Sequence, residues 1–266
     1  MVRVLSAFRQ GAGGSRLAFL AERTATAKRD KEALLRCFAD APVEAADVVV
    51  ALGGHSHMLR SMHRVAGSGL PLFGMDSRDA GFLMNDFSVA DLDRRIGASE
   101  SAALVPLSAR VRRLNDRTVH LIAYNEVALL RQTSRMAHIR VRVDGIERLN
   151  PLIGDGILLA TPAGSTAYNL SAHGPVLPLE AKLLALTPIN PFRPRRWPGA
   201  LISERAELVF DVLQPETRAV GLTADHHEVR DIASVHIELA PAQAVKLLFD
   251  PGRHLEDRLI REQFRT

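Results

Sequence analysis

Cysteine is almost absent from this sequence of 266 residues, which contains only Cys37. An intrachain disulfide is therefore excluded, and the single thiol is typical of a protein from a reducing compartment. Long apolar runs are also missing, since none approaches the roughly 18 residues that a membrane-spanning helix needs. The N-terminal segment carries Arg3 and Arg9 but no continuous apolar stretch of the secretory-signal kind. These absences predict a soluble, cytoplasmic protein with no membrane partner.

A strong excess of charge is lacking as well. The 34 basic and 30 acidic residues leave a formal net charge of +4, although the sequence pI of 9.7 leaves a polyanionic partner open. Arginines cluster in the segments 94–95, 110–113 and 193–196. Because no recognised nucleic-acid-binding module accompanies them, we expect solvated faces or oligomer contacts there and no nucleic-acid partner.

Residues 1–101 have the pattern of an α/β domain. The hydrophobic content of 47% suffices for one large domain or two of ordinary size. A strand is expected at Arg16–Ala21, a helix at Thr24–Phe38 and a fully buried parallel strand at Asp47–Leu52. The expected elements that follow are a helix at 58–65, a short strand at 70–74 and a helix at 89–98.

Residues 102–245 have a different texture, which predicts a second, β-rich domain. We expect strands at 103–107, 119–124, 139–143, 157–160, 206–212 and 235–239. The proline-rich segment Thr187–Pro194 is predicted to be a rigid loop crossing. In the remaining segment, 246–266, we expect a short amphipathic helix at 255–264.

Residues 155–168 form the most informative stretch. An apolar strand, Ile157–Ala160, is followed by Thr161-Pro162, which ends regular pairing, and then by Gly164-Ser165-Thr166-Ala167 before Tyr168. This turn offers backbone N–H groups and two hydroxyls without bulk, which suits close approach of a polar ligand. Taken alone, the same residues also fit an ordinary strand-to-helix turn.

Further motifs follow a fixed order along the chain. A buried strand leads into Gly53-Gly54-His55-Ser56, a second glycine segment spans 74–83, Asn125-Glu126 follows, and Thr223-Ala224-Asp225 comes last. Together with residues 155–168, this series resembles the nucleotide-binding signature of the NAD kinase family. The resemblance runs from about Arg16 to the C-terminus.

The resemblance implies a two-domain protein that binds NAD or NADP at the interdomain cleft. It implies phosphoryl transfer to the 2′-hydroxyl of NAD from polyphosphate or from ATP with Mg²⁺, a homodimer or homotetramer, and a C-terminal helix packed back on the first domain. His55 takes the catalytic position, and no metal ligands are assigned. The implied NAD(P)- and ATP-binding residues are Gly53, Gly54, Phe82, Asn125, Glu126, Asp155, Ser165, Thr166, Ala167, Tyr168, Ser171 and Asp225.

The phosphoryl-donor side departs from the family pattern. His55-Ser56 replaces the Asp-Gly of the family's Gly-Gly-Asp-Gly loop, and Asp76-Ser77-Arg78 replaces its Asn-x-Gly. An imidazole, with an unperturbed pKa of about 6.5, can serve as general base. However, the Cβ of Ser56 obstructs phosphate approach. Asp76 adds negative charge, whereas Arg78 either crowds the loop or binds phosphate. We therefore expect an altered donor geometry.

Three functions follow from these observations. The first is an active NAD kinase in which His55 is the base. The second is a catalytically impaired NAD(P)-binding pseudo-kinase that acts as a sensor or regulatory subunit. The third is a metal-dependent nucleotide phosphohydrolase, because His55, His57 and His63 have a spacing that could bind a transition metal if the first two lie on an extended segment. The phosphoryl donor, the preference between NAD and NADH, and the oligomer size stay open.

Overall fold

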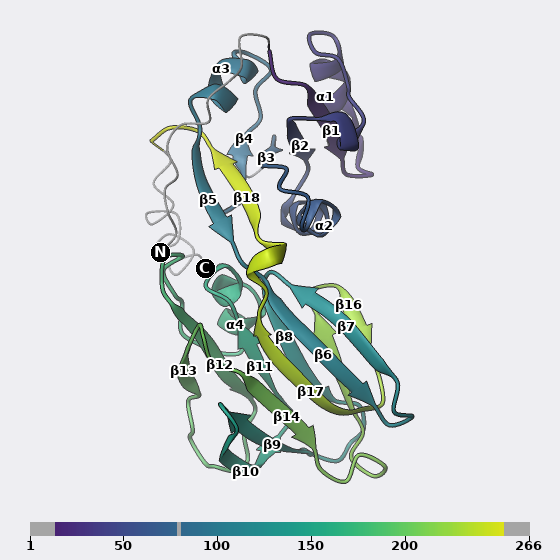
Figure 1. Cartoon of the computed structure of the whole chain (residues 1–266), viewed down its shortest axis with the longest axis vertical. Helices are drawn as coiled ribbons and strands as arrows, with labels where there is room; N and C mark the ends of the chain where they lie inside the picture. Colours follow the sequence, from purple (N-terminus) through teal and green to yellow (C-terminus); the bar gives the residue numbers. More distant parts are fainter. Residues whose placement is uncertain (1–13, 79–80, 253–266) are drawn as a thin grey trace. The chain divides into compact units, whose positions relative to one another are not determined.

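The computed structural model describes residues 14–78 and 81–252. They divide into two compact units with the boundaries 104/105 and 241/242 (Figure 1). We call residues 14–104 with 242–252 the α/β unit, and residues 105–241 the sandwich unit. The predicted boundaries differ, because residues 102–104 and 242–245 belong with the α/β unit. The expected helix at 255–264 lies outside the described residues.

The α/β unit is built on one mixed sheet. Its strand order is β1 (Leu17–Ala21), β2 (Val48–Leu52), β3 (Leu72–Asp76), β18 (Val245–Phe249) and β5 (Glu100–Leu104), with β4 (Asn85–Asp86) paired to β3. The pairs are parallel except for β18 with β5, which is antiparallel. All five residues of β2 are buried, as expected for a strand covered on both faces. The predicted α/β fold of this region is confirmed.

Three α-helices and a short 3₁₀ turn accompany this sheet within the described residues. They are α1 (Ala25–Leu35), η1 (Val43–Ala45), α2 (His55–Val65) and α3 (Leu92–Gly97). Thr24 caps α1 by accepting a hydrogen bond from the Ala27 amide. The predicted start of the second helix at Met58 is wrong, because α2 begins at His55 after the extended Gly54. The first-turn amides of a helix need no intrahelical partner, so residues of modest helix propensity are tolerated there.

The sandwich unit consists of two antiparallel sheets. The first has the order β10 (Ile146–Gly154), β9 (Ala137–Val143), β14 (Leu208–Val212), β17 (Ile232–Leu239), β6 (Leu107–Arg113) and β7 (Thr118–Ala123). The second has the order β13 (Ala200–Ser203), β12 (Leu183–Ile189), β11 (Gly156–Ala160), β8 (Glu126–Arg131), β15 (Val220–Ala224) and β16 (His227–Val229). Buried residues of both sheets, such as Phe210 and Leu159, form one core between them. The predicted β-rich fold is confirmed.

Shorter elements connect these strands. The turn η2 (Ala163–Thr166) and the one-turn helix α4 (Tyr168–Ser171) follow β11, and η3 (Pro241–Gln243) precedes β18. No helix of the described ranges is long and apolar enough to cross a membrane.

The prediction that Thr187–Pro194 is a loop throughout is wrong. Strand β12 continues to Ile189, and Pro188 pairs with Ile157 of β11. On its other side β12 pairs with β13 only as far as Leu186. Pro188 therefore lies where β12 has become an edge strand, and there its missing N–H costs no ladder hydrogen bond.

Asn85 joins three strands of the α/β sheet, and we predict that its loss destabilises this unit. Its fully buried side chain donates to the carbonyls of Gly74 (3.1 Å) and Leu248 (3.0 Å), and it accepts from the Asp250 amide (2.9 Å). Asn85→Ala should lower the free energy of unfolding by about 3 kcal/mol, because buried groups left without partners cost about 1–3 kcal/mol each. Urea denaturation measures this change.

Asn115→Ala, at an exposed turn, serves as the control and should cost well under about 1 kcal/mol. Equal effects of the two substitutions would contradict the structural role of Asn85.

Candidate nucleotide-binding site

The crossing between the two sheets of the sandwich unit is held by Asp225. Strand β7 of the first sheet leads into β8 of the second through Tyr124 and Asn125. The Asp225 carboxylate accepts the amide of Tyr124 at 2.8 Å and that of Asn125 at 2.9 Å. In return, the Asp225 amide donates to the Glu126 carbonyl at 3.2 Å. Asp225 thus fixes the backbone from which the Asn125 and Glu126 side chains project.

The turn after β11 packs directly on this crossing. The Thr161 amide donates to the Asn125 carbonyl at 2.9 Å. The Thr161 hydroxyl donates to the Tyr124 carbonyl at 2.6 Å and accepts from the Gly164 amide at 3.0 Å. A Cβ on Gly164 would collide with the Asn125 carbonyl, so only glycine fits there. The structure brings the Asn125-Glu126 pair and the 164–168 turn together.

Glu126 carries an open hydrogen-bonding position. Burial, and then the negative charge of Asp225, raise its pKa to about 7, while a hydrogen bond from the Tyr168 amide acts in the opposite direction. Its buried Oε2 has no hydrogen-bond partner among the described residues. A buried carboxyl oxygen without a partner is costly. A ligand hydroxyl would therefore be a favourable partner for Glu126.

Tyr168 and Asp155 extend the site along the outer face of the second sheet. Tyr168 packs against a small apolar cluster that includes Ala128, Leu158 and Ala160. Burial, followed by the charges of Glu126 and Asp155, raises the pKa of its phenol.

Asp155 lies at the far end of β11 from Glu126, because Ala160 pairs with Glu126 and Gly156 pairs with Leu130. Its carboxylate accepts from Asn190 Nδ2 at 2.9 Å and from Arg131 Nε at 2.5 Å. These two contacts, in that order, lower its pKa. Arg131 is a site residue that the motifs did not indicate.

The remaining predicted residues of the turn differ in exposure. Ser165 is fully buried; its hydroxyl donates to the Pro162 carbonyl (2.7 Å) and accepts from the Leu177 amide (2.9 Å). Ser165 therefore shapes the turn. Thr166 and Ala167 are partly buried, and Ser171 is exposed. Their contact with a ligand stays a prediction.

Asn169 was missed by the sequence analysis. It is fully buried, donates to the carbonyls of Pro175 (2.8 Å) and Ser165 (3.1 Å), and accepts from the Thr187 hydroxyl (2.6 Å). A polar residue among small ones directly after Tyr168 was the available signal, but its partners are distant in sequence.

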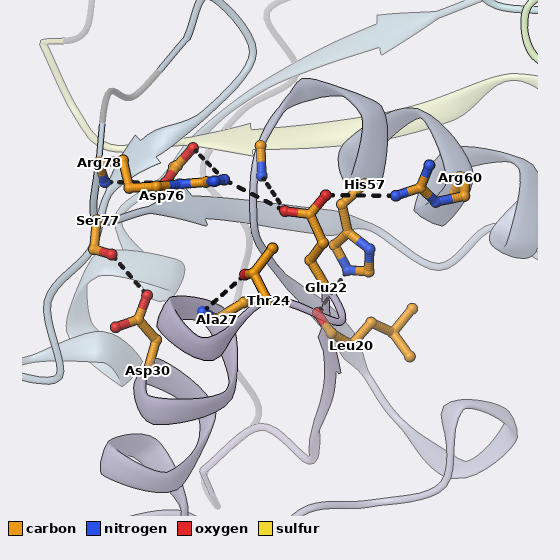
Figure 2. Close-up of polar contacts among 11 residues, drawn as sticks. Leu20, Glu22, Thr24, Ala27, Asp30, His57, Arg60, Asp76, Ser77 and Arg78 are labelled. Carbon is orange, nitrogen blue, oxygen red and sulfur yellow. Dashed lines mark hydrogen bonds and ion pairs between the residues drawn. The ribbon is translucent and has the colours of Figure 1, made fainter.

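The predicted donor-side residues gather in the α/β unit, at the carboxyl ends of three parallel strands. Gly53-Gly54 follows β2 and Asp76 ends β3, while Glu22, which the motifs did not indicate, follows β1. Figure 2 shows Glu22 and Asp76 at this edge. Ligands of open α/β sheets bind at this edge. Gly53 has a φ of +146°, which favours glycine. Ser77 ties this edge to α1 by donating to Asp30 at 2.8 Å.

Charged side chains occupy this edge, and the sequence motifs did not reveal that arrangement. The Glu22 carboxylate accepts the Gly54 amide at 3.4 Å and lies 3.3 Å from Arg78 Nη2. Arg78 also pairs with Asp76, at 3.2 Å, and Asp76 is largely buried. Arg60 lies 3.6 Å from the other oxygen of Glu22 (Figure 2). Asp76 adds negative charge at this edge, as the sequence indicates, but Arg78 compensates this charge.

The expected crowding of the loop by Arg78 has a structural basis. Its Nη2 lies 3.1 Å from the position that a Cβ on Gly54 would take. The Arg78 guanidinium thus covers the Gly54 backbone, which has no side chain of its own and was expected to be open to a phosphate.

The histidines at the start of α2 are on a helix and not on an extended segment. His55 is exposed, and its ring fills the space that a side chain at Gly81 would need. His57 Nε2 donates to the Leu20 carbonyl at 2.9 Å. Two residues correspond to about 200° around a helix, so the premise that His55 and His57 point the same way is wrong. Within residues 14–78 and 81–252, no three His, Cys, Asp or Glu side chains are grouped as metal ligands.

Phe82 is only 2% exposed. Its predicted stacking near a nucleotide base is not tested by these contacts and stays a prediction.

The α/β unit is an open sheet with a glycine loop at its strand ends, and the sandwich unit carries the Asn125-Glu126 crossing. These two features are typical of a nucleotide-binding protein. The family of the ATP-NAD kinase C-terminal domain matches residues 124–243. The NAD kinase of Xylella fastidiosa (strain 9a5c) is 48% identical over 249 residues, which cover 94% of this chain and 96% of that protein. The NAD kinase of Hyphomonas neptunium is 49% identical over 250 residues, which cover 94% and 98%. This chain belongs to the NAD kinase family.

Solved structures share the fold. Yeast NADH kinase complexed with NADH gives a TM-score of 0.80 at 16% identity and covers 96% of this chain and 88% of that one. The Archaeoglobus fulgidus NAD kinase in complex with ATP gives 0.72 at 24% identity and covers 93% and 98%. The predicted family and the two-domain fold are thereby confirmed.

The raised pKa of Glu126 predicts a pH-dependent stability. A carboxyl whose pKa is about 7 in the folded protein stabilises it fully below the unfolded value of about 4.3. This contribution is lost as the pH rises through 7. Glu126→Gln should therefore reduce the fall in the free energy of unfolding between pH 5 and pH 7.5, as measured by urea denaturation at both values.

Glu238→Gln, at an exposed position of the same unit, should leave the pH dependence of the wild type unchanged. If Glu126→Gln loses stability as steeply as the wild type does, the ionisation of Glu126 is not responsible.

Proposed function

We propose that this chain binds NAD or NADP through the sandwich unit and transfers a phosphoryl group from ATP or polyphosphate to the 2′-hydroxyl of NAD. The observation that carries the proposal is the unpartnered, buried Oε2 of Glu126 beside the Thr161–Tyr168 turn. A ribose hydroxyl is a suitable donor for this oxygen. The close relatives named NAD kinase support the same activity.

Each part of the dinucleotide finds a complementary group in this proposal. Tyr168 offers a partly exposed aromatic ring for stacking. Glu126 accepts from hydroxyls, and the nearby Thr166 and Ala167 supply backbone beside the ring. Asp155, whose pKa is lowered by the hydrogen bonds from Asn190 and Arg131, is the acceptor at the other end of the Tyr168 face.

The proposed phosphoryl transfer forms one bond, breaks one bond and moves one proton. The 2′-oxygen forms a bond to the terminal phosphorus of the donor, and the bond from that phosphorus to its bridging oxygen breaks. His55 takes the proton of the hydroxyl, since it is exposed at the first turn of α2. Mg²⁺ enters this proposal as part of the ATP substrate, and no residue of the chain is assigned to hold it.

A second candidate function is NAD(P) binding without efficient phosphoryl transfer. The observation that favours it is the contact of Glu22 with the Gly54 amide, reinforced by Arg78. A carboxylate at this amide competes with a donor phosphate for the same hydrogen bond. In this function the chain is a sensor or regulatory subunit.

The oligomeric state and the location of the protein are also proposals. A homodimer or homotetramer rests on the resemblance to the family, and a cytoplasmic location rests on the single cysteine. Sedimentation of the purified chain distinguishes monomer, dimer and tetramer.

We predict that NAD or NADP binds at least about tenfold more tightly than ATP, a difference of about 1.4 kcal/mol. The reason is that the sandwich residues keep an open site, whereas Glu22 and Arg78 cover the donor loop. Tyr168→Ala should weaken NADP binding by about 1–3 kcal/mol through lost stacking and packing. Calorimetric titration measures both quantities.

Tyr168→Phe is the matched control and should bind NADP nearly as tightly as the wild type, because the ring is kept. Comparable affinities for ATP and NADP would refute the predicted preference, and an unaffected Tyr168→Ala would place the dinucleotide elsewhere.

We predict that formation of NADP from NAD depends on the first turn of α2. His55→Ala should lower the rate with ATP or polyphosphate, and His55→Asp combined with Ser56→Gly should raise it more than either single change. The base and the access to the backbone act as a unit, so their effects are not additive. An enzymatic assay for NADP measures the rates.

His120→Ala, at an exposed histidine outside the site, should leave the rate unchanged. A wild-type rate in His55→Ala shows that the base is elsewhere. A folded double variant that binds NAD but forms no NADP favours the second candidate function.

A further inference from the structure

A separate cavity of about 830 Å³ lies along the free edge of the α/β sheet. Strand β1 is the outermost strand, and the cavity is lined by residues of β1, α1 and α2 together with the segment 22–24. Lys31 from α1 donates to the Phe19 carbonyl at 2.8 Å, and His57 from α2 donates to the Leu20 carbonyl at 2.9 Å. The Phe19 backbone faces the free edge of β1, since its amide donates to the Asp40 carboxylate at 3.0 Å, whereas the His57 contact joins α2 to β1.

The lining of this cavity is strongly basic. Among the described residues that line it, the cationic ones are Arg23, Lys31, Arg60 and Arg64, and Glu22 is the single acidic one. On α2 the lining residues 57, 60, 61 and 64 recur with helical spacing, so they share one face of the helix. Arg60 and Arg64 are four residues apart, and like charges at this spacing on a helix repel each other.

The positive charges of the arginines that line the cavity are only weakly neutralised by acidic side chains. Lys31 is already paired with Asp40 at 2.7 Å. Arg60 reaches Glu22 only at 3.6 Å, and Glu22 is shared with Arg78 and the Gly54 amide. In the part of the chain that the structure describes, Arg23 and Arg64 have neither an ion pair nor a hydrogen bond. Arg60 therefore shares Glu22 with Arg78, and Arg23 and Arg64 add two exposed guanidinium groups to the lining.

The chemistry of the lining selects the class of ligand. Guanidinium groups bind phosphate oxygens in bidentate fashion. The Thr24 hydroxyl, which accepts from the Ala27 amide at 3.2 Å, still has its proton to donate. The only aromatic carbocycle of the lining, Phe19, is 3% exposed and offers no face for a base.

We propose that this cavity is a second anion site, which binds a linear phosphate chain through Arg23, Arg60 and Arg64. It is separate from the donor loop, although Glu22 borders both. Occupation of the cavity would draw Arg60 away from Glu22 and so alter the carboxylate that contacts Gly54. The proposal does not depend on phosphorylation of NAD by this chain.

The test is calorimetric titration of the full chain with tripolyphosphate, without Mg²⁺ and without NAD. Arg23→Gln combined with Arg64→Gln should raise the dissociation constant at least tenfold. Lys28→Gln combined with Arg29→Gln removes the same charge from exposed residues of α1 outside the cavity, and it should change the constant less than twofold. Glu22→Gln should tighten binding, because it removes the only acidic group of the lining.

Arg78→Gln distinguishes this cavity from the donor loop. The cavity site should persist in that variant. Loss of binding in Arg78→Gln with retention in the Arg23/Arg64 variant would place the phosphate chain in the donor loop and overturn the proposal. It is also overturned if the wild type does not bind tripolyphosphate, or if the Lys28/Arg29 variant weakens binding as much as the Arg23/Arg64 variant.

Discussion

The sandwich unit depends on the hydrogen bonds that the Asp225 carboxylate accepts from Tyr124 and Asn125. At this point the chain leaves the first sheet for the second, so neither amide has a strand partner. A backbone amide left unpaired inside a protein costs about 1–3 kcal/mol. Asp225 satisfies both and simultaneously brings a negative charge towards Glu126. The same carboxylate therefore sets the geometry of the crossing and contributes to the raised pKa of Glu126.

Much of the candidate site in the sandwich unit could be predicted from the sequence, because its key contacts are made by the backbone. Gly164 must be glycine since the Asn125 carbonyl occupies the space of a Cβ, and such a requirement leaves a readable motif. The Asn125-Glu126 pair and Asp225 were identified for the same reason. Arg131 and Asn169 were not, because their roles arise from partners such as Thr187 that become neighbours only when the strands pair. The end of strand β12 was missed because a proline indicates a loop, whereas Pro188 is tolerated in the strand at a local sheet edge.

The donor side was harder to predict because side chains from three separate strand ends determine it. The motif showed which residues replaced the family pattern, but not that Arg78 pairs with both Asp76 and Glu22. Charge assigned residue by residue predicted that Asp76 adds negative charge to the loop, but it did not predict the ion pair with Arg78 that compensates this charge. The first turn of α2, before Met58, was also not predicted, because the first residues of a helix need neither strong helix propensity nor intrahelical amide partners.

The two sides differ in how much change the fold tolerates. Helix α2 is anchored by its buried Met58 and Met62, and its start is set by the backbone at Gly54. His55 and Ser56, at the first turn of α2, are exposed, so substitutions there leave the buried anchors of the helix in place. By contrast, a side chain at Gly164 or the loss of Asp225 disrupts the crossing between two sheets. The fold thus tolerates substitution at the exposed first turn of α2 more readily than at the packed crossing between the two sheets of the sandwich unit.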